Sequence, residues 1–106
     1  MYSISKIAQE FGLSRSALLY YDSIELLKPS SRSSSGYRQY SREDKNKLQQ
    51  ICAYRQMGLS IKEIQKLIDL SKNESASILE AHLLKLSEQI QSLRKQQYTI
   101  EHAAKR

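Results

Sequence analysis

Cysteine, proline and glycine are scarce in this sequence, whose 106 residues include one cysteine, one proline and three glycines. A single cysteine cannot form a disulfide within the chain, so disulfide bonds do not hold this fold together. Cys52 lies in an amphipathic helical pattern, and we expect a buried small residue there rather than a redox or metal-binding thiolate. A reducing, cytosolic compartment fits this composition.

Long apolar runs are also missing. No window approaches the roughly 20 apolar residues that a membrane-spanning helix needs. The N-terminus lacks the charged and then apolar pattern of a secretory signal. We therefore expect a soluble, cytoplasmic protein with no membrane partner. Because 40% of the residues are hydrophobic, the chain has enough apolar side chains for one small core.

Patterns typical of catalysis are absent as well. The sequence shows no paired carboxylates, no nucleophile beside a base and no glycine-rich phosphate loop, so an enzyme is the weakest functional class. The two histidines, His82 and His102, stand 20 residues apart with no cysteine pair nearby. We expect them to be exposed helix residues rather than ligands, and the sequence predicts neither a metal nor another cofactor.

Positive charge is concentrated in the middle of the chain, between Lys28 and Lys62. The formal net charge is +6, and the segment holds eight basic residues against Glu43 and Asp44, so it accounts for the whole excess. The basic residues are Lys28, Arg32, Arg38, Arg42, Lys45, Lys47, Arg55 and Lys62. Such a segment indicates a surface that binds a polyanion, although charge alone leaves open a solvated surface with spare lysines.

Two short helices are predicted in residues 3–27. Ser3 or Ser5 can cap the first, which Gly12 ends, and Ser14 can cap the second. The apolar residues that recur at helical spacing are Ile4, Ile7, Ala8 and Phe11 in the first helix, and Leu18, Tyr21 and possible inward positions Leu19 and Ile24 in the second. This spacing is typical of a helix-turn-helix, and it leaves Arg15, Ser16 and Tyr20 pointing outward.

A serine-rich loop follows, SRSSSGYRQYS from Ser31 to Ser41. Pro29 and the serines break the helical period, which is compatible with a flexible linker. By contrast, the segment with Tyr37, Arg38 and Tyr40 alternates in residue type and contains aromatic side chains, a pattern that favours a short strand. A small two-stranded wing with serine and glycine at its tip accounts for both halves of the loop.

Two further helices are predicted before residue 70. Ser41 is placed to cap the third, Gly58 ends it, and Ser60 with Glu63 has the spacing of a capping box for the fourth. Their expected inward residues are Leu48, Ile51, Cys52 and Met57 in the third helix, and Ile61, Ile64, Leu67 and Ile68 in the fourth.

After a polar break at Leu70–Ser75, the rest of the chain has one long helical pattern. Its apolar residues follow the a and d positions of a heptad, with one polar residue in the seam: Leu79, Leu83, Leu86, Ile90, Leu93, Gln97 and Ile100. Packing back onto its own domain is the alternative, but so long a helix would extend beyond a domain this small, which favours dimerisation. The sequence does not decide between parallel and antiparallel strands.

In the order of these elements the chain resembles the mercury-resistance regulator (MerR) family of bacterial transcription regulators. YSISKIAQEFGLSRSALLYYDSIELLKP matches the family's first helix-turn-helix, SGYRQYS its wing and QMGLSIKEIQKLI its second helix pair. The resemblance implies a mainly α fold, in which a winged helix-turn-helix domain of four short helices and a two-stranded wing (1–70) precedes a linker and a coiled-coil dimerisation helix (71–106). The family's effector-binding domain is absent, so we expect either that it was removed or that this is a short regulator.

The resemblance also assigns roles to single residues. Ser14, Arg15 and Ser16 match the turn that enters the major groove, where Arg15 could donate two hydrogen bonds to guanine. Tyr20 is assigned to phosphate contact and Tyr21 to the core, whereas Tyr37 and Arg38 of the wing, with Arg55 of the third helix, are assigned to phosphate. Two departures from the family are Leu19, where many members have arginine, and Glu25, where many have glycine. Glu25 implies a backbone that need not adopt a glycine-only conformation.

Members of this family bind a two-fold symmetric operator in an overlong promoter spacer and distort the DNA so that RNA polymerase can use it. The resemblance therefore implies a homodimer, with promoter DNA as its partner and polymerase acting indirectly through that DNA. Two alternatives remain: an architectural winged-helix protein similar to phage excisionases, and a coiled-coil module that binds an acidic protein.

Overall fold

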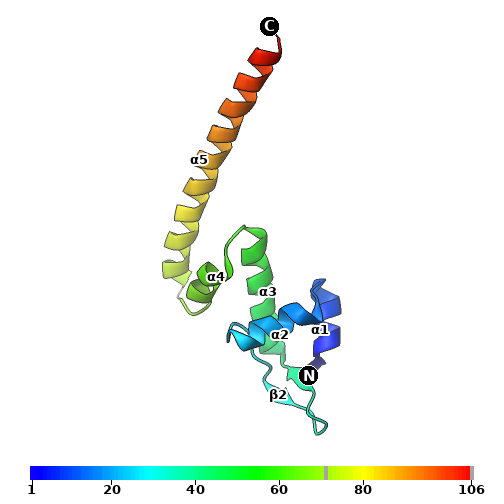
Figure 1. Cartoon of the computed structure of the whole chain (residues 1–106). Helices are drawn as coiled ribbons and strands as arrows, with labels where there is room; N and C mark the ends of the chain where they lie inside the picture. Colours follow the sequence, from blue (N-terminus) through cyan, green and yellow to red (C-terminus); the bar gives the residue numbers. More distant parts are fainter. Residues whose placement is uncertain (71, 106) are drawn as a thin grey trace. The chain divides into compact units, whose positions relative to one another are not determined.

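The computed structural model describes residues 1–70 and 72–105, and for Lys72 the backbone alone. Within these residues the chain forms β1 (Tyr2–Ser3), α1 (Ile4–Phe11), α2 (Arg15–Ser23), β2 (Ser31–Arg32), β3 (Arg38–Tyr40), α3 (Arg42–Gln56), α4 (Ile61–Ile68) and α5 (Lys72–Ala104) (Figure 1). The elements group into two compact units, residues 1–69 and 70–106. The predicted fold class, a winged helix-turn-helix followed by a long helix, is confirmed.

Serine side chains start four of the helices. Ser3 accepts a hydrogen bond from the backbone N–H of Lys6, which settles the choice between Ser3 and Ser5, and Ser14 accepts one from Ala17. Ser41 and Ser60 each form a full capping box, with Asp44 and Glu63 respectively. Because each cap satisfies a backbone donor that the helix itself leaves free, these predicted helix starts are confirmed.

The wing is part of a three-stranded antiparallel sheet in the order β1-β3-β2. Arg32 pairs with Arg38 as expected for a hairpin, and Gly36 takes a φ of 85° in its turn. The third strand was not predicted: Tyr2 pairs with Tyr40 on the other edge of β3. A strand of two residues is too short to show an alternating pattern, so the sequence carries no period-2 signal for it.

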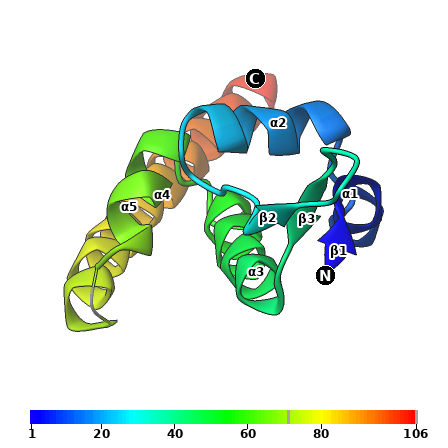
Figure 2. The ribbon, with the colours of Figure 1, turned by 90° about the horizontal axis from the view of Figure 1, so that it is seen from below.

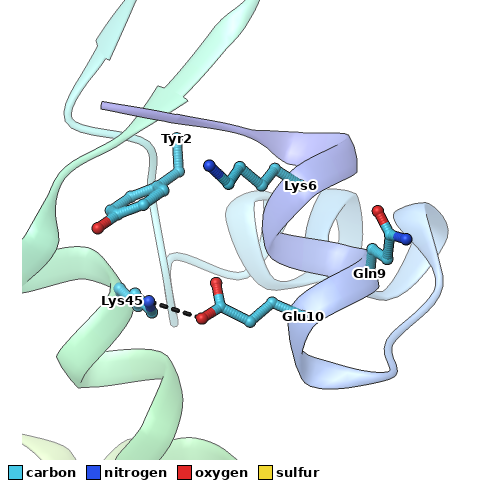
Figure 3. Close-up of a pocket in the computed structure, with 5 residues that line it drawn as sticks. All are labelled: Tyr2, Lys6, Gln9, Glu10 and Lys45. Atoms are coloured by element: carbon cyan, nitrogen blue, oxygen red, sulfur yellow. Dashed lines mark ion pairs between the residues drawn. The ribbon is translucent and has the colours of Figure 1, made fainter.

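A clamp of charged side chains holds β1 against α1 and α3. The Tyr2 ring lies between the ammonium groups of Lys6 and Lys45, which are 5.6 and 4.9 Å from its centre. Lys45 also forms an ion pair of 2.7 Å with Glu10, and this carboxylate raises the pKa of Lys45 (Figure 3). These residues and Gln9 line a surface hollow of about 360 Å³.

The core of the first unit is apolar, and its fully buried side chains come from every helix of that unit. They include Ile7 (α1), Leu18 (α2), Leu48 and Ile51 (α3), Ile64 and Leu67 (α4), with Leu26, Leu27 and Tyr40 between them. Three inward predictions were wrong in part. Met57 is 45% exposed because it follows the last turn of α3, Leu19 lies outward on α2, and Cys52 is half-buried. Burial still raises the pKa of the Cys52 thiol.

The expectation for Glu25 was wrong. Its φ is 62°, which places it in the left-handed region that glycine adopts most readily. The chain needs this conformation because the two residues that follow, Leu26 and Leu27, are both 1% exposed and must turn back into the core. Glu25 therefore keeps a strained backbone, and its carboxylate lies 3.9 Å from the Lys28 ammonium group.

Replacing Glu25 by glycine is expected to raise the free energy of unfolding by about 0.5–1 kcal/mol. The left-handed conformation costs an L-residue about 1–2 kcal/mol, and glycine removes this cost. Because glycine has more conformational freedom in the unfolded chain, part of the gain in stability is lost again. Urea unfolding of both proteins measures the difference. Lower stability of Glu25→Gly would show that the Lys28 contact outweighs the backbone strain.

The second unit is dominated by α5, a continuous helix of 33 residues. The predicted polar break at Leu70–Ser75 was too long, since Lys72 to Ser75 are helical, and Ser71 lies outside the described residues. No proline or glycine interrupts the segment after Lys72, so the helix continues through the whole heptad pattern.

Candidate nucleic-acid interface and dimer seam

One side of α2 is exposed and carries the predicted major-groove residues. Arg15 and Ser16 are exposed in its first turn, and Tyr20 follows one turn later at 51% exposure. Tyr21, its neighbour, is 2% exposed, so the predicted split between an outward and an inward tyrosine is confirmed. Ser14 is exposed, but its hydroxyl oxygen already accepts the capping hydrogen bond from Ala17.

The wing tip is an ordered turn rather than a flexible linker. Ser33 donates its backbone N–H to Tyr37 O at 2.8 Å, and its hydroxyl accepts from Tyr37 N at 3.1 Å. Arg32 reaches across the turn to Gly36 O at 3.1 Å. With its backbone fixed in this way, Tyr37 presents a side chain that is 67% exposed. The turn thus holds an aromatic hydroxyl outward at the end of the wing.

The base of the wing is tied to α3 by the carboxylate of Asp44, which the sequence analysis counted only as a negative charge in the basic segment. Asp44 accepts backbone hydrogen bonds from Ser30, before β2, at 3.1 Å and from Ser41, after β3, at 2.8 Å. The Ser30 hydroxyl donates to the same carboxylate. Both ends of the wing therefore meet at one side chain in the first turn of α3.

Arg38 does not stand free in the wing. Its Nε donates to Asp22 Oδ2 on α2 at 3.0 Å, and the two side chains are only 29% and 15% exposed. Lys28 lies 3.5 Å from the same carboxylate. The Arg38 hydrogen bond, followed by the charge of Lys28, holds the pKa of Asp22 below its ordinary value of 3.8. Asp22 was missed because its partner lies 16 residues away.

The second helix pair holds the C-terminal half of α2. Arg55 is exposed near the end of α3, and its Nη1 donates to the Tyr21 hydroxyl at 3.4 Å. Gln65 of α4 donates to the Ile24 carbonyl, just after α2, at 3.1 Å. In the view of Figure 2, the wing strands lie between α2 and α3. Contacts from the wing and from the second helix pair thus both end on α2.

The predicted seam on α5 is mostly uncovered within the single chain. Leu83, Ile90, Leu93 and Ile100 are exposed, as is Gln97, whereas Leu79 and Leu86 are half-buried. Leu83 is 62% exposed and repeats at heptad spacing with Ile90, and such a stripe is typical of a helix that packs against another helix.

The described ranges contain neither a group of metal-binding side chains nor a membrane-spanning helix. No three His, Cys, Asp or Glu side chains in residues 1–70 and 72–105 lie close enough together to bind a metal ion. In the same part of the chain, no helix is long and apolar enough to cross a membrane.

Comparison with known families gives a match over most of the chain. The family described as MerR HTH family regulatory protein matches residues 2–71, and the family described as MerR, DNA binding matches residues 46–103. The chain belongs to the MerR family. The helices and the small antiparallel wing agree with this result, because the structural neighbours are N-terminal DNA-binding domains of MerR regulators with a long C-terminal helix.

Relatives of this MerR chain include characterised regulators. The HTH-type transcriptional activator TipA of Streptomyces coelicolor is 38% identical over 106 residues, which cover 96% of this chain and 40% of TipA. The chain thus spans less than half the length of that relative. The N-terminal fragment of Mta, the multidrug transporter activator of Bacillus subtilis, superposes with a TM-score of 0.88 at 31% identity and 97% coverage of both chains.

A third MerR relative was solved on DNA. HiNmlR, described as a MerR family regulator lacking the sensor domain and bound to promoter DNA, superposes with a TM-score of 0.68 at 26% identity. The match covers 89% of this chain and 76% of HiNmlR. A MerR fold of this kind therefore occurs in complex with a promoter.

Proposed function

We propose that this MerR chain binds an inverted-repeat operator as a homodimer and controls transcription by distorting promoter DNA. In this proposal residues 1–70 are the DNA-binding domain, and 71–106 are a linker and the dimerisation helix. RNA polymerase responds through the promoter DNA, the protein acts in the cytoplasm, and no enzymatic reaction is involved, in keeping with relatives that are transcription regulators.

The observation that carries the proposal is the arrangement around α2. Its exposed side presents Arg15, Ser16 and Tyr20, while Arg38 of the wing and Arg55 of α3 hydrogen-bond to α2 residues from two other elements. A helix inserted in the major groove is flanked by two phosphate backbones, so basic side chains on either side of it can bind the phosphates. HiNmlR supports this use of the fold, since it was solved on promoter DNA.

Within this frame each site residue has a role. Arg15 reads a guanine edge with two hydrogen bonds, and Ser14 and Ser16 contact the DNA beside it. The remaining residues contact phosphates: Tyr20 from α2, Tyr37 and Arg38 from the wing and Arg55 from the second helix pair. Binding that rests on so many phosphate contacts weakens steeply as salt rises.

The homodimer is supported by the α5 seam. Its residues, Leu79, Leu83, Leu86, Ile90, Leu93, Gln97 and Ile100, repeat at heptad spacing along 33 helical residues, and the exposed ones leave apolar surface that a second copy would cover. Two copies related by a two-fold axis present two copies of α2, which is the symmetry of an inverted repeat.

In vitro transcription tests the proposal. A promoter with the operator inside its spacer is expected to change its output when the chain is added, whereas the same operator moved upstream of the promoter elements leaves output unchanged. Equal effects at both places, or none at either despite DNA binding, would favour an architectural protein. Failure to bind any duplex at low salt would favour a coiled-coil module that binds an acidic protein.

A further inference from the structure

An acidic residue lies within the surface that the proposed function assigns to DNA. Asp22 projects from α2 between that helix and the wing, and its carboxylate is bonded to Arg38 at 3.0 Å and to Lys28 at 3.5 Å. Glu25 joins the group through its contact with Lys28. Two carboxylates and two cations sum to zero, so beyond the Debye length of about 10 Å the cluster adds no attraction for DNA.

The geometry of the Asp22–Arg38 bond leaves the DNA-binding edge of the guanidinium available. Arg38 uses its Nε to bind the carboxylate, and the other N–H donors of a guanidinium sit on its two Nη atoms. A guanidinium is planar, so fixing Nε against α2 also fixes the plane in which the Nη donors lie. Because Arg38 is 29% exposed, part of its side chain reaches solvent beside α2.

We propose that Asp22 is a positioning residue for DNA binding. It locks the wing arginine to α2, so that the Nη edge of Arg38 is presented to a DNA phosphate at a fixed distance from the major-groove residues. This inference rests on the proposed function and adds a residue that the sequence analysis did not name. A carboxylate that acted only through its charge would repel DNA, and removing that charge would then tighten DNA binding. If Asp22 positions Arg38, removing its charge weakens DNA binding instead.

Two amide substitutions separate these roles. Asp22→Asn and Glu25→Gln each remove one negative charge from the same cluster and keep the shape of the side chain. Only Asp22→Asn weakens the bond to Arg38, since Glu25 contacts Lys28 alone in this cluster, at 3.9 Å. Charge-assisted hydrogen bonds are roughly twice as strong as neutral ones, so the neutral amide holds the guanidinium less firmly.

Fluorescence anisotropy with a duplex carrying the inverted repeat measures the outcome. We expect Asp22→Asn to weaken binding about fivefold, and Glu25→Gln to leave it unchanged or slightly tighter. Asp22→Asn binding as tightly as Glu25→Gln would overturn the inference. A wild-type chain that binds no duplex would overturn the proposed function and this inference with it, which keeps the two failures distinct.

Arg38→Lys provides a second test, and the single variant does not depend on the stability of Asp22→Asn. Lysine keeps the positive charge but lacks the planar fork, so it cannot bind Asp22 and a phosphate in the same fixed geometry. We expect binding about fivefold weaker than wild type, and little further loss when Arg38→Lys is combined with Asp22→Asn. Wild-type affinity for Arg38→Lys, or full additivity in a double variant that remains folded by circular dichroism, would contradict a positioning role.

Discussion

Replacing Leu83 by lysine is expected to convert the proposed dimer to monomers and to weaken operator binding by a factor of at least about one hundred. Leu83 is 62% exposed in the single chain and occupies an a position of the seam, where two copies would bury it. An unpaired ammonium group at such a position costs several kcal/mol. Without the dimer, each half-site is bound separately, and the gain from a shared, high local concentration is lost.

Leu84 provides a matched control one residue away. It is also a leucine and is 63% exposed, yet it lies outside the heptad seam. Leu84→Lys is therefore expected to remain dimeric and to bind the operator like the wild type. Sedimentation equilibrium and operator titration measure both properties. If the two variants behave alike, the interface lies elsewhere than the a and d positions of α5.

Replacing Arg15 by alanine is expected to reduce the preference for the operator over unrelated DNA by at least about thirtyfold. A bidentate contact between an arginine and a guanine contributes about 1–3 kcal/mol of discrimination, and the proposed dimer would place two copies of Arg15 on the operator. Unrelated DNA, bound through phosphates, should lose only the small contribution of one positive charge per chain.

The ratio of the affinity for the operator to the affinity for unrelated DNA distinguishes base recognition from attraction by charge. Arg42 at the start of α3 is exposed and also carries one positive charge, so Arg42→Ala serves as the control. It is expected to leave the ratio of operator to unrelated binding unchanged. If Arg15→Ala lowers both affinities by the same factor, Arg15 contacts phosphate, and another residue reads the bases.

Local signals explain why so much of the fold was predictable. Ser14, Ser41 and Ser60 each act on a backbone N–H three residues away, so a helix start is visible in a few letters of sequence. The left-handed backbone of Glu25 had no such signal, because the burial of Leu26 and Leu27 dictates it. The same holds for Met57, whose exposure depends on where α3 ends.

For the candidate site, the sequence predicted which residues are exposed but not the contacts that hold them in place. Helical periodicity was enough to place Arg15, Ser16 and Tyr20 on one exposed side of α2. The contacts that hold this helix in place were not visible. Asp22 meets Arg38 across 16 residues, Ser30 meets Asp44 across 14 and Gln65 meets Ile24 across 41, so only the folded chain brings them together.

Selection of genomic DNA fragments by the purified chain at two salt concentrations tests whether this MerR chain is a sequence-specific regulator. We expect that one inverted repeat is enriched, that it maps to promoter spacers, and that its recovery falls as salt rises. Recovery of fragments that share no sequence, with the same dependence on salt, would contradict a sequence-specific regulator and would leave a winged helix that binds DNA by charge alone.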